Sequence, residues 1–292
     1  MRVRVPASSA NLGPGFDCFG IAWQLYNEIE FYHSPELIIS GCPEKYQNRD
    51  NLAYLGYAAV LRASGLAEEP AEIRFTSSDI PICRGLGSSS ALIVGGVLAA
   101  NRLHGLGLSK KELLHIAAAV EGHPDNIAPA ILGGLTASIM DEQGRVLSAG
   151  FRLSDELHFT ALIPDFELST ELARSVLPRQ ISRADAISNI SRAALLLKAL
   201  ETGDAELLPD ALRDRLHEPY RLGLIPGVER VRELALGCGA AGMCISGAGS
   251  TLLCISRSPG FAADMAKAMA GEFPAWRVVP VAPDLDGAVV LE

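Results

Sequence analysis

Basic residues are not in excess in this chain of 292 residues: 25 Lys and Arg stand against 34 Asp and Glu, so the formal net charge is −9. This balance argues against a nucleic-acid-binding protein, which needs a basic surface, and we expect no nucleic-acid partner. Any anionic ligand must then be held by a local site that works against the overall field. Aromatic residues make up only 6% of the chain, but 49% of residues are hydrophobic and 20% are charged. This composition is typical of a folded globular protein and excludes a disordered one.

The six cysteines form no CxxC pair and no Cys/His cluster with the spacing of zinc ligands. We therefore expect neither a thiolate metal site nor a disulfide scaffold, but buried free thiols in a reducing cytoplasm. Pro6 interrupts the N-terminus before the apolar segment of a signal peptide can form. The uncharged segment 234–256 is long enough to span a bilayer, but its glycines and serines indicate a helix end, a turn and a strand. We expect no membrane partner.

The length of the chain favours two domains, which we place at residues 1–150 and 151–292. In the first, residue patterns predict strands over 3–5, 21–31, 37–39, 73–76 and 133–140, and helices over 51–63, 92–100 and 109–120. In the second, they predict strands over 157–163, 243–245, 251–255 and 276–279, and helices over 170–177, 183–200, 205–216, 226–237 and 262–269. That second order is typical of a ferredoxin-like layout, so the fold class is α+β.

A loop rich in glycine and serine, residues 81–91, runs directly into an apolar helix. Gly85 and Gly87 allow the backbone to turn tightly and to approach a ligand closely. The unpaired N–H groups of the first helical turn and three serine hydroxyls add donors, which is the chemistry of a phosphate-binding loop. The loop is not of the Walker A type, because no lysine follows the second glycine. The alternative interpretation is an ordinary glycine-serine entry into a helix.

A second glycine motif, residues 237–242, matches GxGxxG. It follows a predicted helix and precedes a predicted strand, which is the reverse of the order in dinucleotide-binding proteins. We interpret it as a helix end and a turn, and a nicotinamide-dependent dehydrogenase is not favoured.

Two further segments concentrate polar residues. The loop 6–17 ends in a carboxylate, and Asn11 and Asp17 could face a ligand or form a local Asx turn. Residues 121–126 place a glutamate, a histidine, an aspartate and an asparagine within six positions, where Asp125 or Asn126 could instead cap the next helix.

The second half contributes two arginines and a glycine turn. Thr170 is placed to cap a helix, and Arg174 lies four residues further on the same face. Without a ligand, Arg174 and Arg221 would be ordinary surface ion-pair partners. Residues 246–250 would be a tight hairpin turn.

Taken together, VPASSANLGPGFD, PICRGLGSSSA, EGHPDNIAPAILGG and SGAGSTLL resemble, in this order and spacing, the GHMP small-molecule kinases. The likeness runs from Val5 to about Ile255. The glycine-serine loop is shared by the whole superfamily, whereas EGHPDNIAP and NLGPGFD are similar to the branch that phosphorylates the side-chain hydroxyl of L-homoserine. Ser250 stands where many relatives have proline, and Cys18-Phe19 replaces small or aliphatic residues; neither touches a proposed catalytic group.

The resemblance implies a two-domain GHMP kinase fold, with an N-terminal domain like ribosomal protein S5 domain 2 and a C-terminal ferredoxin-like domain. It also implies ATP and Mg²⁺ as cofactors and a small-molecule substrate, L-homoserine, which is phosphorylated for threonine synthesis. A cytoplasmic location and a homodimer are implied as well.

The residues that the resemblance implies fall into three groups. For ATP they are Pro81, Ile82, Cys83, Arg84, Gly85, Leu86, Gly87, Ser88, Ser89, Ser90 and Ala91, with Asn51 beside the adenine. For Mg²⁺ they are Ser89 and Glu121, whose oxygens suit this ion. For the substrate they are Asn11, Asp17, His123, Asp125, Thr170, Arg174, Arg221 and Gly247, and the catalytic candidates are Asp125, Asn126 and Arg174.

An amino-acid substrate also fits the charges of these residues. A zwitterion needs a carboxylate for its ammonium group, which Asp17 or Asp125 can supply, and cations for its carboxylate, which Arg174 and Arg221 can supply. A mevalonate or sugar-alcohol kinase has no use for the ammonium partner. The alternatives are a kinase of the same superfamily acting on threonine, shikimate or an isoprenoid alcohol, and a non-catalytic ligand-binding protein. Whether Asp125 or Asn126 faces the substrate hydroxyl is left open.

Overall fold

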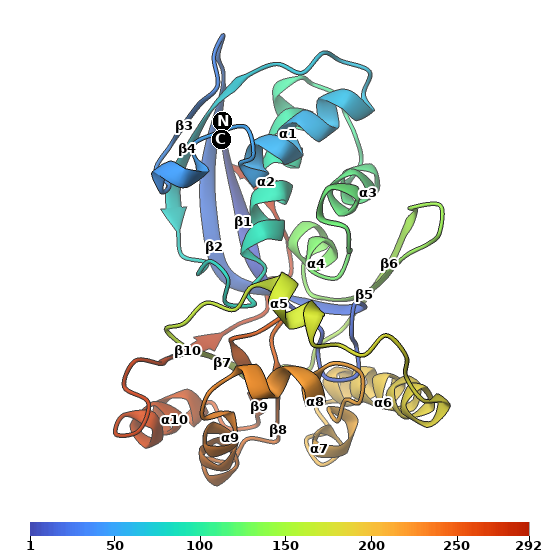
Figure 1. Cartoon of the computed structure of the whole chain (residues 1–292), viewed down its shortest axis with the longest axis vertical. Coiled ribbons are helices and arrows are strands. Elements are labelled where there is room, and N and C mark those ends of the chain that lie inside the picture. The colour runs from blue at the N-terminus through green and yellow to red at the C-terminus, as the bar shows by residue number, and fades with distance from the viewer. Residues whose placement is uncertain (292) are drawn as a thin grey trace.

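The computed structural model describes residues 1–291, which form an upper and a lower part stacked along the long axis (Figure 1). The upper part is built on a seven-stranded sheet of order β11-β1-β2-β4-β3, in which β5 pairs with β2, and β6 pairs with β5. Its strands are β1 (Arg2–Ala10), β2 (Phe19–His33), β3 (Ile38–Ser40), β4 (Ala71–Ser78), β5 (Leu135–Met140), β6 (Val146–Phe151) and β11 (Val289–Leu291).

Four helices cover one face of this sheet (Figure 1). They are α1 (Leu52–Ala63), α2 (Ser88–Leu103), α3 (Lys110–Glu121) and α4 (Ile127–Leu132), and a short 3₁₀ helix, Glu44–Tyr46, precedes α1. A Cβ on Gly96 of α2 would lie 1.9 Å from the Ala53 carbonyl oxygen of α1, so only glycine allows these two helices to pack this closely. The close packing fixes the position of α2, whose N-terminus opens toward the lower part.

The lower part is a four-stranded antiparallel sheet of order β10-β7-β9-β8. Its strands are β7 (His158–Ile163), β8 (Gly242–Ile245), β9 (Leu252–Ser256) and β10 (Arg277–Val281). Its helices are α5 (Thr170–Ser175), α6 (Arg183–Thr202), α7 (Leu208–Ala211), α8 (Glu218–Arg221), α9 (Val228–Gly237) and α10 (Phe261–Met269), with a 3₁₀ turn at Leu222–Leu224. This order confirms the ferredoxin-like prediction and the α+β class.

Along the sequence, strands β1–β6 of the upper sheet precede residues 152–157, and the strands of the lower sheet follow them. This division is close to the boundary predicted after residue 150. The last strand crosses this division, because β11 returns to the upper sheet and pairs with Arg2–Arg4 of β1. The chain therefore begins and ends in the upper part, which the sequence did not indicate.

Several predicted elements need correction. Residues 6–10 are not loop but the buried end of β1, since β2 pairs with them through a bulge after Pro6. The helix predicted over 205–216 is only the four-residue α7, and α9 begins at Val228 rather than Pro226, with Gly227 in left-handed conformation as its N-cap. Ser169, not Thr170, caps α5, because its side chain accepts the Leu172 N–H. Strand β6 was not predicted at all.

The six cysteines are all free, but the expectation of buried thiols is wrong for most of them. Cys244 and Cys254 are buried and burial raises the pKa of both thiols, whereas Cys83 is exposed. The segment 234–256 contains the end of α9 and strands β8 and β9, so the GxGxxG match is a helix end and a turn, as predicted. Within residues 1–291, no helix has the length and apolar character needed to cross a membrane.

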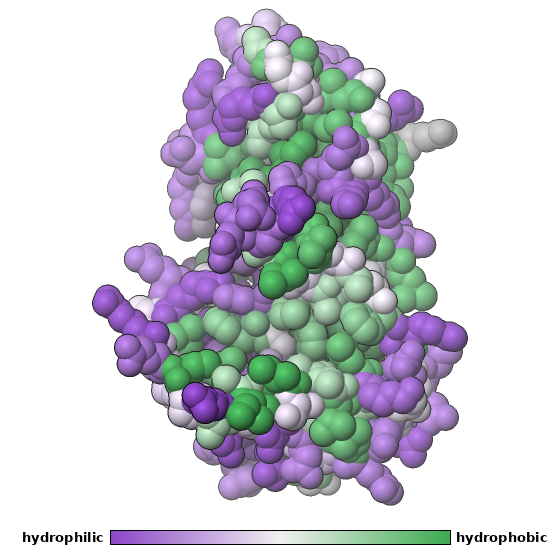
Figure 2. All heavy atoms as spheres, turned by 90° about the vertical axis from the view of Figure 1, so that its right-hand side faces the viewer, coloured by the Kyte–Doolittle hydropathy of each residue, from purple (hydrophilic) through white to green (hydrophobic). Residues whose placement is uncertain are grey.

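The face formed by the β5–β6 hairpin and α6 exposes large apolar side chains (Figure 2). Ile139 and Leu147 of the hairpin are 59% and 57% exposed, and Ile190 of α6 is 72% exposed. The core itself lies between the upper sheet and its four helices and continues into the lower part.

Candidate active site

The predicted phosphate loop leads into the first turn of α2, which begins at Ser88, earlier than the sequence pattern suggested. Gly87 is the N-cap, with a left-handed φ of 69°. Ala91 N–H donates to Gly87 O at 2.9 Å as the first helical hydrogen bond, so the N–H groups of residues 88–90 have no helical partner. The positive end of the helix dipole and these N–H groups form a site suited to phosphate oxygens.

The loop is held between the two parts of the molecule. Ser8 N–H of β1 donates to Leu86 O, while Leu168 N–H donates to Cys83 O, both at 3.1 Å. A Cβ on Gly85 would lie 2.1 Å from the Ser246 carbonyl oxygen, and Ser246 Oγ donates to Gly85 O at 2.5 Å. Gly85 is therefore required by the contact between the phosphate loop and the 246–250 turn.

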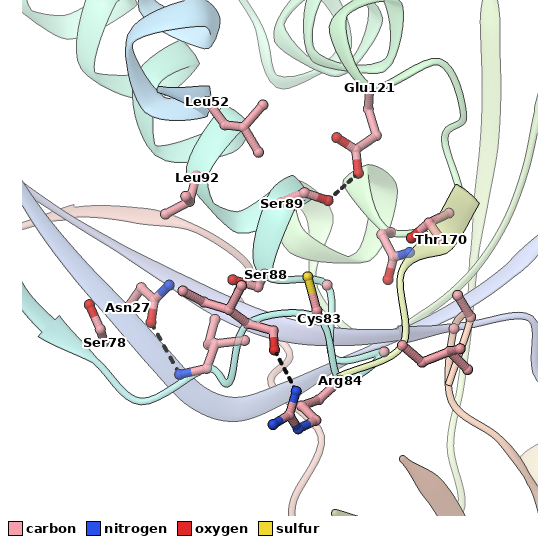
Figure 3. A pocket seen from close by; sticks show the side chains of 18 of the residues that line it. Asn27, Leu52, Ser78, Cys83, Arg84, Ser88, Ser89, Leu92, Glu121 and Thr170 are labelled. Atoms are coloured by element: carbon pink, nitrogen blue, oxygen red, sulfur yellow. Dashed lines mark hydrogen bonds between the residues drawn. The ribbon is translucent and has the colours of Figure 1, made fainter. Parts of the chain in front are cut away.

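The C-terminus of α3 meets the N-terminus of α2 through Glu121 (Figure 3). Ser89 Oγ and Ser90 Oγ donate to the same carboxylate oxygen, Glu121 Oε1, at 2.6 and 2.8 Å. Ser89 is exposed and lies at the pocket, whereas Ser90 is fully buried. A hydroxyl and a carboxylate are hard oxygen donors, so Ser89 and Glu121 fit a Mg²⁺ site.

A pocket with a volume of about 410 Å³ runs along this loop between the two parts. In Figure 3, Asn27, Ser78 and Leu92 lie on one side of Ser88 and Ser89, and Thr170 lies on the other. Most of the predicted site residues line it: Asn11, Asn51, Ile82, Cys83, Arg84, Gly85, Gly87, Ser88, Ser89, Glu121, His123, Asp125, Asn126, Thr170, Arg174, Arg221 and Gly247. Among the described residues, Asp17, Pro81, Leu86, Ser90 and Ala91 do not line it.

Arg84 and Asn51 line the pocket, but their side chains are already engaged. The Arg84 guanidinium donates to the carbonyl oxygens of Pro164 and Asp165 at 3.1 and 2.7 Å, so it ties the loop to the end of β7. Asn51 caps α1, where its Oδ1 accepts Ala53 N–H at 2.9 Å and its Nδ2 donates to Tyr46 O at 2.8 Å. Both side chains shape the pocket through the backbone that they hold.

Asp17 pairs with Arg174, although their opposite charges predict contacts with opposite ends of a zwitterionic substrate. Two nearly parallel hydrogen bonds join them, from Arg174 NH2 to Asp17 Oδ1 at 2.7 Å and from NH1 to Oδ2 at 3.1 Å. These hydrogen bonds raise the pKa of Arg174. Asn11, at φ 58°, accepts the Asp17 N–H on Oδ1 and donates to Gly247 O, so it connects β1, this loop and the 246–250 turn.

Asp125 is buried in the pocket wall, 1% exposed, with two hydrogen-bond donors on Oδ1. His123 Nδ1 lies 2.7 Å from this oxygen and Asn126 N–H donates to it at 3.0 Å. Burial acts to lower the pKa of His123, but the hydrogen bond to Asp125 and the charges of Asp125 and Glu121 outweigh it, so that the pKa is raised. Asn126 Oδ1 accepts the Ser8 hydroxyl at 2.9 Å, which positions its amide.

Arg221, like Asp125, is almost completely buried in the pocket wall, at 1% exposure. Its Nε donates to Ala173 O at 3.0 Å, and NH1 lies 3.3 Å from Gly247 O. Burial, followed by the nearby charge of Arg174, lowers the pKa of Arg221. Two arginines whose charges repel one another at the same pocket are suited to bind an anion such as a carboxylate.

No pattern in the sequence predicts the apolar end of the pocket. It contains Tyr46, Leu52, Phe75, Ile80 and Leu92, which come from the 3₁₀ helix, α1, β4, the phosphate loop region and α2. No sequence motif connects these five residues, and each is of a type found in ordinary core or surface positions. Only the packing of these elements brings them together.

The comparisons with known proteins agree with this geometry. Family models described as "GHMP kinases N terminal domain" and "GHMP kinases C terminal" match residues 51–134 and 196–275. A homoserine kinase of Clostridium botulinum strain ATCC 19397 is 45% identical over 88% of this chain and 86% of its own. The chain belongs to the homoserine kinase family of GHMP kinases. A second relative, the homoserine kinase of Clostridium botulinum strain Alaska E43, is 41% identical over 100% of this chain and 99% of its own.

The fold agrees as well. The crystal structure of homoserine kinase from Cytophaga hutchinsonii superimposes with a TM-score of 0.87 at 30% identity, covering 100% of this chain and 97% of that one. The chain therefore has the complete two-domain GHMP kinase fold and is an ATP-dependent kinase.

Proposed function

We propose that this GHMP kinase transfers the γ-phosphoryl group of ATP to the side-chain hydroxyl of L-homoserine, giving O-phospho-L-homoserine for threonine synthesis. One observation carries the proposal: a single pocket joins an apolar end, a helix N-terminus with unpaired N–H groups, and a polar end with Asp125, Arg174 and Arg221. These three surroundings suit an adenosine, a triphosphate and a small zwitterion, in that order.

ATP would bind along the loop 81–91. The N–H groups of residues 88–90 and the dipole of α2 face the phosphates, where they stabilise the charge that develops during transfer. The apolar end, with Tyr46 and Phe75, would receive the adenine. This placement leaves the terminal phosphate between Ser89 and the polar end.

Ser89 and Glu121 would hold Mg²⁺, since their oxygens already lie 2.6 Å apart at the pocket. When bound, the ion neutralises phosphate charge. The Ser89 hydroxyl donates to Glu121 Oε1, which directs both oxygens to the same place.

L-Homoserine would place its ammonium group at Asp125 and its carboxylate at Arg174 and Arg221, with Thr170, His123, Asn11 and Gly247 completing the pocket. We assign Asp17 to the orientation of Arg174, because the two side chains are paired. If Asp125 holds the ammonium group, Asn126 faces the hydroxyl, and the hydroxyl proton passes to the phosphate without a protein base.

An ADP-release assay tests the function directly. We expect turnover with L-homoserine that requires Mg²⁺, and none with mevalonate, shikimate or L-threonine at equal concentrations. Turnover with mevalonate but not with L-homoserine would overturn the substrate assignment. Tight binding of L-homoserine without turnover would instead support the non-catalytic alternative.

The role of Asp125 is tested by Asp125→Asn, with Asn126→Ala as its comparison. We expect Asp125→Asn to raise the KM for L-homoserine by about 10- to 10²-fold while kcat changes less, because a lost charge-assisted contact is worth roughly 1.5–3 kcal/mol. Complete loss of kcat at saturating L-homoserine would instead make Asp125 the general base.

An enzyme that uses ATP and a free amino acid is expected in the cytoplasm, where both are found. A homodimer is also part of the proposal, with the apolar face of β5, β6 and α6 as its contact. Sedimentation of the purified protein tests this: a monomer at all concentrations would exclude it.

A further inference from the structure

A cluster of two histidines and a glutamate lies at the end of the upper part, away from the pocket. His33 is the last residue of β2, His104 is the C-cap of α2, and Glu69 lies in the segment between α1 and β4. One ligand atom from each of the three side chains lies within 4.8 Å of the others. None of them lines the active-site pocket.

In the described part of the chain, the side chains of His33 and Glu69 form no hydrogen bond, whereas His104 is hydrogen-bonded to Tyr57. Within residues 1–291, Glu69 forms no ion pair, although its neighbour Glu68 pairs with Arg62. The rings of His33 and His104 meet edge to face with centroids 5.2 Å apart. His33 and Glu69 are exposed, so both can rotate to shorten the distances within the cluster.

We propose that His33, Glu69 and His104 bind a divalent first-row transition metal ion, with Zn²⁺ as the preferred occupant. Two imidazoles and one carboxylate favour such an ion over Mg²⁺ or Ca²⁺, which take oxygen ligands. Tetrahedral Zn²⁺ with bonds of about 2.0–2.1 Å needs ligand atoms roughly 3.3 Å apart, so a closure of about 1.5 Å is enough. A water molecule completes the four ligands.

Tyr57 acts as a positioning residue for this site. Its hydroxyl, on the buried face of α1, lies 2.6 Å from His104 Nε2. This contact leaves Nδ1 of His104 as the ligand atom and fixes the orientation of the ring. An outer contact of this kind changes metal affinity by about 10–100-fold.

The bound ion would connect three elements that the sequence keeps apart. It would join the end of β2, the end of α2 and the segment before β4, at the opposite end of α2 from its phosphate-binding N-terminus. A helix of 16 residues is about 24 Å long, so the site stabilises the fold and takes no part in the chemistry.

The test uses the untagged full-length protein, stripped of metals with a chelator and titrated with Zn²⁺ against a competing chelator. We expect His33→Ala and Glu69→Gln to weaken the binding of one Zn²⁺ by about tenfold or more, and Tyr57→Phe to weaken it by a similar factor. His115→Ala removes an exposed histidine on α3, outside the cluster, and serves as the matched control. Comparison of variants in the same background separates this ion from any bound by the free cysteines.

Thermal unfolding supplies the second readout. Zn²⁺ should raise the Tm of the unmodified protein and of His115→Ala, but not that of His33→Ala, and excess Mg²⁺ should not abolish the shift. Equal Zn²⁺ affinity in the unmodified protein, His33→Ala and Glu69→Gln would overturn the proposal. A Zn²⁺-dependent rise in Tm that persists in both His33→Ala and Glu69→Gln would also overturn the proposal.

Discussion

Asp17 and Arg174, which are 157 residues apart in the sequence, form a bidentate ion pair with N–O distances of 2.7 and 3.1 Å. The pair joins the loop after β1 to helix α5, and so links the upper part of the molecule to the lower. Arg174 lines the pocket whereas Asp17 does not. Asp17 therefore orients the arginine, and we propose that the arginine binds the substrate.

Asp17→Asn should raise the KM for L-homoserine by about fivefold, which corresponds to about 1 kcal/mol, because Arg174 loses its orientation. The unfolding free energy should change by less than about 1 kcal/mol, since both side chains are more than one third exposed. Steady-state kinetics and urea unfolding measure the two effects. Asp141→Asn, which breaks an exposed pair with Arg145, is the control and should leave the KM unchanged.

Ser89→Ala and Glu121→Gln should each lower kcat by on the order of 10² and move the Mg²⁺ dependence to higher concentration, because one oxygen donor at the pocket is lost. Ser90→Ala is the comparison, since Ser90 donates to the same carboxylate from a buried position. It should lower stability by about 1–3 kcal/mol with little change in Mg²⁺ dependence. Equal kinetic effects for Ser89→Ala and Ser90→Ala would contradict the assignment of Ser89.

Gly85→Ala should destabilise the protein by about 3 kcal/mol or more and abolish tight ATP binding, as measured by urea unfolding and nucleotide titration. A Cβ there meets the Ser246 carbonyl oxygen at 2.1 Å, and φ is +74°. Gly65→Ala separates the two causes, because Gly65 has φ +71° but no atom within 4 Å. That variant should lose only about 1–2 kcal/mol. If both variants lose the same amount, the close approach of the loop is not the cause.

Glu218→Gln should remove a pH-dependent loss of stability. Burial raises the pKa of Glu218 from 4.5 to about 8, so the folded protein keeps a proton that the unfolded chain has lost. The contribution of this group is fully present below pH 4.5 and is lost as the pH rises through about 8. Glutamine cannot ionise, and its Oε1 can still accept the Ile245 N–H that Glu218 accepts at 2.7 Å.

Between about pH 5 and pH 8, urea unfolding should show a decline in stability for the unmodified protein that exceeds that of Glu218→Gln by on the order of 1–3 kcal/mol. Glu142→Gln, on the exposed β5–β6 turn, is the control and should keep the full decline. A parallel decline in all three proteins would show that Glu218 is not the group responsible.

The local elements of this protein were largely predictable. The helices predicted over 51–63 and 109–120 are α1 and α3, which begin at the Asn51 cap and the Ser109–Glu112 capping box. The strand and helix order of the second half indicated a ferredoxin-like sheet. These features depend on hydrogen bonds and periodicities within a few residues. The errors occur where a contact between distant residues determines the secondary structure. Residues 289–291 form β11 only because they pair with β1, and residues 6–10 extend β1 only because β2 lies beside them.

The chemistry of the proposed phosphate-binding loop follows from the sequence alone, because the glycines and serines of residues 81–91 act within one loop and one helical turn. The folded arrangement was needed to show that Asp17 pairs with Arg174 rather than a substrate, and that Ser90 is buried while Ser89 lies at the pocket. It was also needed to show that Tyr46 and Phe75 form the apolar end of the pocket. Residues so far apart along the chain come into contact through the packing of whole helices and strands, and their spacing in the sequence does not predict this packing.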